Sequence, residues 1–162
     1  MKSFNKIIDT CINILSAIAA FALGFLLLGI CYSTFSRFFF NKPLTNLVEY
    51  SSYSLIYITF FGSPKILRNR GHISLDILTN ALSKKSNLRL GMFVNVLGAV
   101  LSAIITYFGG KVAIDNFVNN IRVMDSMGTP QYLLTMVIPI GMFFMMIQFF
   151  RNSVEDYRNL KS

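Results

Sequence analysis

Four apolar segments divide the chain, and most of its charged residues lie between them. The segments are Ile12–Phe35, Leu47–Leu67, Leu90–Phe108 and Tyr132–Phe150, each about 19 to 24 residues long. At ~1.5 Å per residue, a helix of this length crosses the ~30 Å hydrocarbon core of a bilayer. Only a helix can do so without leaving backbone amides and carbonyls unpaired in lipid. The pattern therefore predicts an all-α integral membrane protein with four transmembrane helices.

Little of the chain is left for anything else. Four spans and their short loops use nearly all of the 162 residues, so we expect a single membrane domain over residues 1–162. Apolar residues make up 54% of the chain and charged residues 14%, which is far from a soluble composition. The net charge is +8, but the basic residues flank the spans, which is typical of a membrane protein and not of a nucleic-acid-binding one.

The distribution of basic residues predicts the orientation. The N-terminal arm, the second loop and the C-terminal tail together hold eleven lysines and arginines, and the first and third loops hold four. By the positive-inside rule, both termini and the second loop are cytoplasmic. The first apolar segment contains sites that resemble signal-peptide cleavage sites, but it runs on to Phe35 and is expected to be an uncleaved span.

The second loop contains a short amphipathic segment, Ile73–Leu82. Apolar residues cover one side of it in helical projection, and Asp76, Thr79, Asn80 and Ser83 cover the other. Ten residues are too few to cross a bilayer, so we expect an interfacial helix lying among lipid headgroups, flanked by basic residues that contact them.

Small and polar residues form a stripe along the third apolar segment. The stripe consists of Gly91, Asn95, Gly98, Ser102, Thr106 and Gly109. Ala20 and Gly24 form a shorter small-residue pair on the first segment. Such residues let helices approach closely, either within the chain's own bundle or against another membrane protein, and the spacing leaves both open.

One proline precedes the last apolar segment and another lies inside it. Thr129 and Pro130 are expected to begin its helix as N-cap and first helical residue. Pro139 lies inside the segment and predicts a kink, because its ring frees the carbonyl of Thr135.

No pattern of catalytic, cofactor-binding or metal-ligating residues is visible. The single histidine, His72, lies in the second loop, four residues before Asp76, and an isolated pair of this kind does not indicate catalysis. Cys11 and Cys31 would lie about 30 Å apart on one helix, too far to bridge. Few ionisable residues lie deep in a span, which argues against both an autonomous ion-coupled pump and a membrane enzyme.

Two charged residues lie at the outer ends of the first two segments. Arg37 ends the first and Glu49 begins the second. They either form a salt bridge that fixes the two helix ends or extend independently into the headgroup region.

An ordered series of motifs resembles one membrane-protein family. The series is Arg37–Leu44 with the sequence RFFFNKPL, Glu49, Phe61–Gly62, Arg70–Asp76 with the sequence RGHISLD, Pro130, and Pro139–Gly141. In this order and spacing it is similar to the small, DctQ-like membrane subunit of tripartite ATP-independent periplasmic (TRAP) transporters. Gly71, His72 and Asp76 belong to the fourth motif. Two features depart from the family pattern: Phe38 stands where tyrosine is common, and the chain has no tryptophan.

The resemblance implies a function that the chain does not perform alone. A periplasmic binding protein would capture an organic anion, such as sialic acid or a C4-dicarboxylate. A large membrane subunit would carry it with sodium in an elevator-like motion. The small subunit would pack against the static scaffold of the large subunit and widen it, in the inner membrane of a bacterium. Two alternatives are a self-contained four-helix homodimeric transporter and an anchor subunit of a membrane enzyme. The first needs a carboxylate in mid-span, whereas Asp9 lies at the membrane edge.

Overall fold

The computed structural model describes residues 2–41, 44–69, 84–125 and 128–161. Its helices are α1 (Lys2–Phe40), α2 (Thr45–Arg68), α4 (Lys84–Val118), α5 (Tyr132–Thr135) and α6 (Val137–Lys161). Within these ranges the one β-type pairing is an isolated bridge between Arg122 and Pro130. The described part of the chain is therefore all-α, as predicted. The expected interfacial segment Ile73–Leu82 lies outside the described residues.

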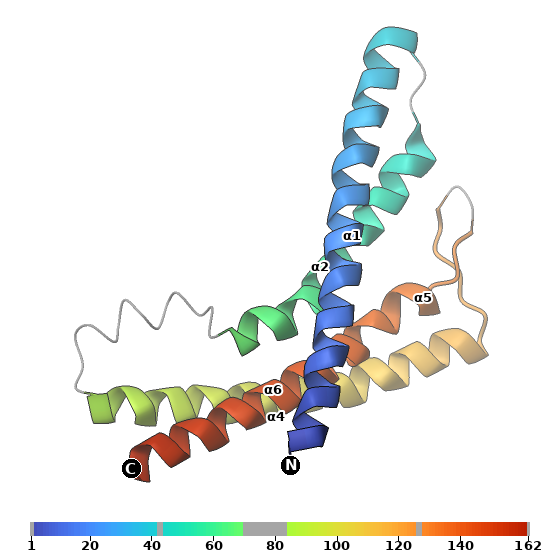
Figure 1. Ribbon diagram of the computed structural model, residues 1–162. Helices are drawn as coiled ribbons and strands as arrows, with labels where there is room; N and C mark the ends of the chain where they lie inside the picture. Colours follow the sequence, from blue (N-terminus) through green and yellow to red (C-terminus); the bar gives the residue numbers. More distant parts are fainter. Residues whose placement is uncertain (1, 42–43, 70–83, 126–127, 162) are drawn as a thin grey trace.

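The long helices form two antiparallel pairs that cross each other. Figure 1 shows α2 running back beside the upper half of α1, while α4 and α6 lie side by side across the lower half of α1. The two pairs meet where α2 and the N-terminal part of α1 approach α6. The arrangement is thus two crossed helix pairs rather than four parallel helices.

The α1–α2 pair packs through small side chains. On α1, a Cβ added at Gly29 would lie 3.7 Å from the Leu47 side chain and would collide with the Ser51 hydroxyl. On α2, a Cβ at Gly62 would lie 3.9 Å from the Cβ of Ala19. These close approaches give α1 one buried face, on which Ile12, Leu15 and Ala19 are no more than 8% exposed.

The small-residue stripe on α4 packs against α6 of the same chain. Asn95 Nδ2 donates to Asp156 Oδ2 at 2.8 Å, and a Cβ at Gly91 would lie 3.3 Å from the same oxygen. A Cβ at Gly98 would lie 2.7 Å from the Phe149 ring, and one at Gly109 would lie 3.5 Å from Pro139. Of the two readings that the sequence leaves open for this stripe, the contacts favour packing within the chain's own bundle.

A second glycine brings α2 and α6 together. A Cβ at Gly141 would collide with the carbonyl oxygen of Phe60 and lie 2.7 Å from its Cβ. Beside this crossing, Leu15, Ala19, Phe61 and Val137 form a buried apolar cluster. The core therefore sits at the junction of α1, α2 and α6.

The start of the last helix differs from the sequence-based expectation. The helix begins at Tyr132, with Gln131 at the N-cap position and no side-chain cap bond, so assigning Thr129 as N-cap was wrong. Thr129 donates its hydroxyl to the Asp125 carboxylate instead of capping the helix, and Pro130 forms the bridge to Arg122, so the helix begins after both. The regular helix is interrupted at Met136, between α5 and α6, one turn before Pro139, which is where the freed Thr135 carbonyl predicts a kink.

By length and composition, three described helical stretches could cross a membrane: Asn5–Phe40, Arg89–Val118 and Tyr132–Arg158. Helix α2 is not among them, although its 24 residues reach about 36 Å at ~1.5 Å per residue. Its mean hydropathy is lowered by serines, a glutamate and a lysine in the sequence TNLVEYSSYSLIYITFFGSPKILR.

Candidate functional site

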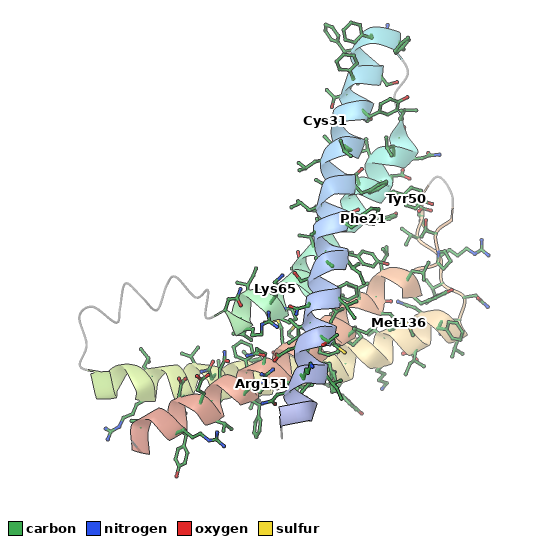
Figure 2. The ribbon with its side chains drawn as sticks, viewed as in Figure 1. Phe21, Cys31, Tyr50, Lys65, Met136 and Arg151 are labelled. Atoms are coloured by element: carbon green, nitrogen blue, oxygen red, sulfur yellow. The ribbon has the colours of Figure 1, made fainter. Side chains whose placement is uncertain are left out.

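Three charged side chains join α1, α2 and α6 at one end of the molecule. Arg151 Nη1 of α6 donates to Asp9 Oδ1 of α1 at 2.7 Å, and Arg68 Nη1 of α2 lies 3.7 Å from the same oxygen. The three side chains are 25% to 37% exposed, so water reaches them only in part. Figure 2 shows Arg151 where the lower part of α1 crosses α6. One carboxylate on α1 therefore binds an arginine of α2 and an arginine of α6, which links the three helices.

Amides extend this polar junction into the protein. Arg68 Nη2 donates to Asn13 Oδ1 at 3.0 Å, which adds a second α1–α2 link. Gln148 and Asn152 are 3% and 6% exposed, and Gln148 Nε2 donates to Asn152 Oδ1 at 2.9 Å. Asn152 Nδ2 in turn donates to the Leu67 carbonyl at 3.3 Å, near the end of α2. These bonds satisfy polar atoms that would otherwise be costly to bury.

A second polar cluster joins α2 to the loop after α4 and to α5. Tyr53 donates to Asp125 Oδ2 at 3.2 Å, Tyr50 bonds Thr129 at 3.3 Å, and Tyr57 donates to the Leu133 carbonyl at 3.1 Å. Figure 2 shows Tyr50 beside this loop. The Thr129 hydroxyl and backbone amide hold the pKa of the Asp125 carboxyl below its usual value. Asp125 is therefore ionised at neutral pH and accepts the bonds from Tyr53 and from the hydroxyl and backbone amide of Thr129.

The residues singled out from the sequence fall into three groups. Gly91, Asn95, Gly98 and Ser102 lie on the α4 stripe, where Ser102 is 2% exposed. Arg37 is exposed near the end of α1, and Glu49 is half-buried in the first turns of α2. A salt bridge between Arg37 and Glu49 stays a prediction. Gly71, His72 and Asp76 lie outside the described residues.

One face of α1 has no covering within the described chain. Ala17 and Ala20 are exposed, and a Cβ added at Gly24 would meet nothing within 4 Å. Phe21 and Leu28 on the outward side of the same helix are 79% and 74% exposed. The Ala20–Gly24 pair thus differs from the α4 stripe, because it leaves room for another helix that the described residues do not supply.

The polar junction could not be located from sequence reasoning, which treated Asp9 only as a carboxylate too near the membrane edge for ion transport. The one sequence signal that could have located the junction is a lone acidic residue at the start of an apolar helix, since such a charge needs a partner. Its partner Arg151 lies 142 residues away, so only the fold identifies it. Among the described residues, no group of three or more histidine, cysteine, aspartate or glutamate side chains could hold a metal ion.

Comparison with known families identifies a match over most of the chain. The family model described as "Tripartite ATP-independent periplasmic transporters, DctQ component" matches residues 26–159, which is most of the chain. No curated protein matches the chain in a sequence comparison. The matched range begins within α1 and includes α2, α4, α5 and nearly all of α6.

Proposed function

This chain belongs to the DctQ component family of the tripartite ATP-independent periplasmic transporters, and we propose that it is the static scaffold subunit of one such transporter. That family is a transporter component rather than an enzyme family. The proposed transporter imports an organic anion with sodium in a bacterial inner membrane. The large membrane subunit carries the substrate, and a periplasmic protein delivers it. The proposed role of this chain is to hold the large subunit in the bilayer while part of that subunit moves.

The open small-residue face of α1 carries this proposal. Helix association in a bilayer gains little from the hydrophobic effect and depends on close packing at small residues. The α4 stripe is already used by α6, whereas Gly24 has no neighbour within 4 Å of an added Cβ. A helix of the large subunit fits against Ala17, Ala20 and Gly24 without any rearrangement of this chain. Arg37 and Glu49, near the other end of the α1–α2 pair, are placed in the same proposed interface.

We expect Gly24→Leu to separate the two subunits without unfolding this chain. The added side chain occupies open space in the chain alone, but in the complex it would force the partner helix away. Overpacking of about 1–3 kcal/mol corresponds to association weakened about fivefold to about 150-fold. The measurement is co-purification of the large subunit with this chain, together with the thermal stability of the chain in detergent.

Matched variants distinguish this interface from general effects on folding. Val100 on α4 is 53% exposed, and Val100→Leu is expected to change neither measurement. Gly98→Leu should lower the chain's own stability, because Phe149 of the same chain occupies that space. Arg37→Ala and Glu49→Ala are expected to reduce co-purification while leaving the substrate affinity of the remaining complex unchanged. Normal assembly of the Gly24→Leu variant would contradict a docking role for this face.

We further propose four spans, with α2 as the second. The hydroxyls of Ser51, Ser52, Ser54 and Thr59 donate to carbonyls four residues earlier in α2, at 2.7 to 3.2 Å. A helix whose hydroxyls are satisfied by its own backbone can enter lipid at lower cost than its hydropathy suggests. The 36-residue stretch of α1 and the 30-residue stretch of α4 are both longer than a helix needs to cross the ~30 Å hydrocarbon core. This extra length supports spans that are tilted in the membrane, as helix pairs that cross each other require.

The four-span topology predicts which cysteines an impermeant thiol reagent reaches in intact cells. Met124 is in the loop after α4 and is fully exposed, and Tyr157 near the C-terminus is 58% exposed. In a background lacking Cys11 and Cys31, Met124→Cys should react from outside, and Tyr157→Cys only after the membrane is opened. Asp76→Cys, in the proposed interfacial helix, should behave like Tyr157→Cys. A three-span topology would also place Met124 and Tyr157 on opposite sides of the membrane, so these two variants cannot decide between three spans and four. Ser3→Cys decides, because adding or removing the second span changes the side of the N-terminus. We expect Ser3→Cys to be labelled from the cytoplasm, and labelling from the periplasm would reject the fourth span.

A further inference from the structure

A cleft of about 780 Å³ opens beside the polar junction. It is formed by the N-terminal end of α1, the C-terminal end of α2 and the C-terminal half of α6. Three arginines line it: Arg68, Arg151 and Arg158. We refer to it as the arginine cleft. Neither the scaffold role nor the docking face of α1 uses it.

The arginine cleft carries an excess of positive charge. Arg151 and Arg158 are seven residues apart, which places them two turns apart on one side of α6. Arg68 approaches from α2. The two carboxylates nearby are Asp9, bonded to Arg151, and Glu155, which also lines the cleft, so the three cations exceed the anions by one. Each guanidinium has five N–H donors, and Asp9, Asn13 and Gln148 use only some of those on Arg68 and Arg151.

The remaining wall of the cleft is apolar. Ile8 of α1 and Ile147, Phe150 and Val154 of α6 line it. Phe150 and Val154 are 66% and 39% exposed, so they face the surroundings of the helix rather than the protein core. A site for a small soluble anion has no need of such a wall, whereas a molecule with a charged group and hydrocarbon chains would contact both surfaces.

From these features we propose that the arginine cleft binds an anionic phospholipid, its phosphate on the arginines and its acyl chains along the apolar wall. The proposal rests in part on the orientation given with the proposed function, which puts this end of the chain at the cytoplasmic leaflet. That leaflet is negatively charged, and basic pockets between helices on that side recognise lipid headgroups. Arginine suits this role because its planar fork of donors matches a phosphate.

Arg158→Gln tests the site without disturbing the junction. Arg158 is exposed, and no hydrogen bond or ion pair of Arg158 to another described residue is present, so its loss should leave the fold intact. The matched control is Arg122→Gln, which removes an exposed arginine in the loop after α4. The purified full chain, with any partner that co-purifies, is placed in phosphatidylcholine nanodiscs doped with phosphatidylglycerol, and retained lipid is measured by native mass spectrometry.

We expect the unmodified chain to retain phosphatidylglycerol in preference to phosphatidylcholine. Arg158→Gln should weaken that retention about fivefold, the effect of one basic residue near an anionic surface, while Arg122→Gln leaves it unchanged. Equal retention of the two lipids, or equal loss in both variants, would overturn the proposal. Displacement of phosphatidylglycerol by an equal concentration of glycerol 1-phosphate would assign the cleft to a soluble phosphate ester instead. The lipid retained is measured on this chain itself. A failure of the large subunit to co-purify would therefore contradict the proposed function but not the lipid site.

Discussion

Gly141→Leu is expected to destabilise the chain by about 3 kcal/mol, the upper part of the range for overpacked interiors. The reason is the crossing of α6 over α2 at Phe60, where even a Cβ would collide with backbone atoms. A flexible side chain can rotate away from such a contact, but the Phe60 carbonyl cannot move without shifting α2. Gly141→Ala should cost less, because better helix propensity returns up to about 1 kcal/mol.

Gly110 provides the control for this comparison. It lies within α4, and an added Cβ there would meet nothing within 4 Å. Gly110→Ala and Gly110→Leu should therefore be neutral or slightly stabilising, since both residues favour a helix over glycine. The measurement is the free energy of unfolding in mixed micelles titrated with SDS. Equal effects of leucine at positions 141 and 110 would mean that α2 and α6 do not cross at Gly141.

The helices could be predicted from the sequence because helix formation here depends on local composition. A run of apolar residues long enough to span lipid has no alternative to helix, and Ile12–Phe35, Leu47–Leu67 and Leu90–Phe108 all lie within described helices. The interruption of the helix before Pro139 has an equally local cause, since the missing N–H acts within one turn. The predicted start of the last helix was wrong because the Asp125 carboxylate competes for the Thr129 hydroxyl. A capping rule considers only residues of the helix and does not include that competitor.

The contacts between helices were not accessible in the same way. The α4 stripe identified the residues that pack closely, but its spacing could not say whether the facing helix was α6 or another protein. Gly141 belongs to the Pro139–Gly141 motif, and only the position of Phe60 shows why a glycine is needed there. Likewise, the pairing of Asp9 with Arg68 and Arg151 depends on how three helices meet, which no local pattern encodes.

Asp9→Ala is expected to destabilise the chain by about 1–3 kcal/mol. This value lies between the small effect of breaking an exposed pair and the ~3–5 kcal/mol of breaking a buried one, since Asp9 and its arginines are 25% to 37% exposed. The loss should exceed that of a typical surface pair for a second reason. One carboxylate serves two arginines from different helices, so its removal leaves two like charges close together without the carboxylate that lies between them.

A double-mutant cycle separates the ion pair from other effects of the substitutions. Asp9→Ala and Arg151→Ala should show a coupling free energy of about 1–2 kcal/mol, within the range for directly contacting residues. The cycle with Arg68→Ala should give a smaller coupling, because Arg68 lies 3.7 Å from the carboxylate and Arg151 lies 2.7 Å from it. The cycle with Arg158→Ala, two turns further along α6, should give none. If all three arginines coupled to Asp9 equally, the effect would be one of overall charge at this end of the chain, and the junction would not be what holds α1 against α6.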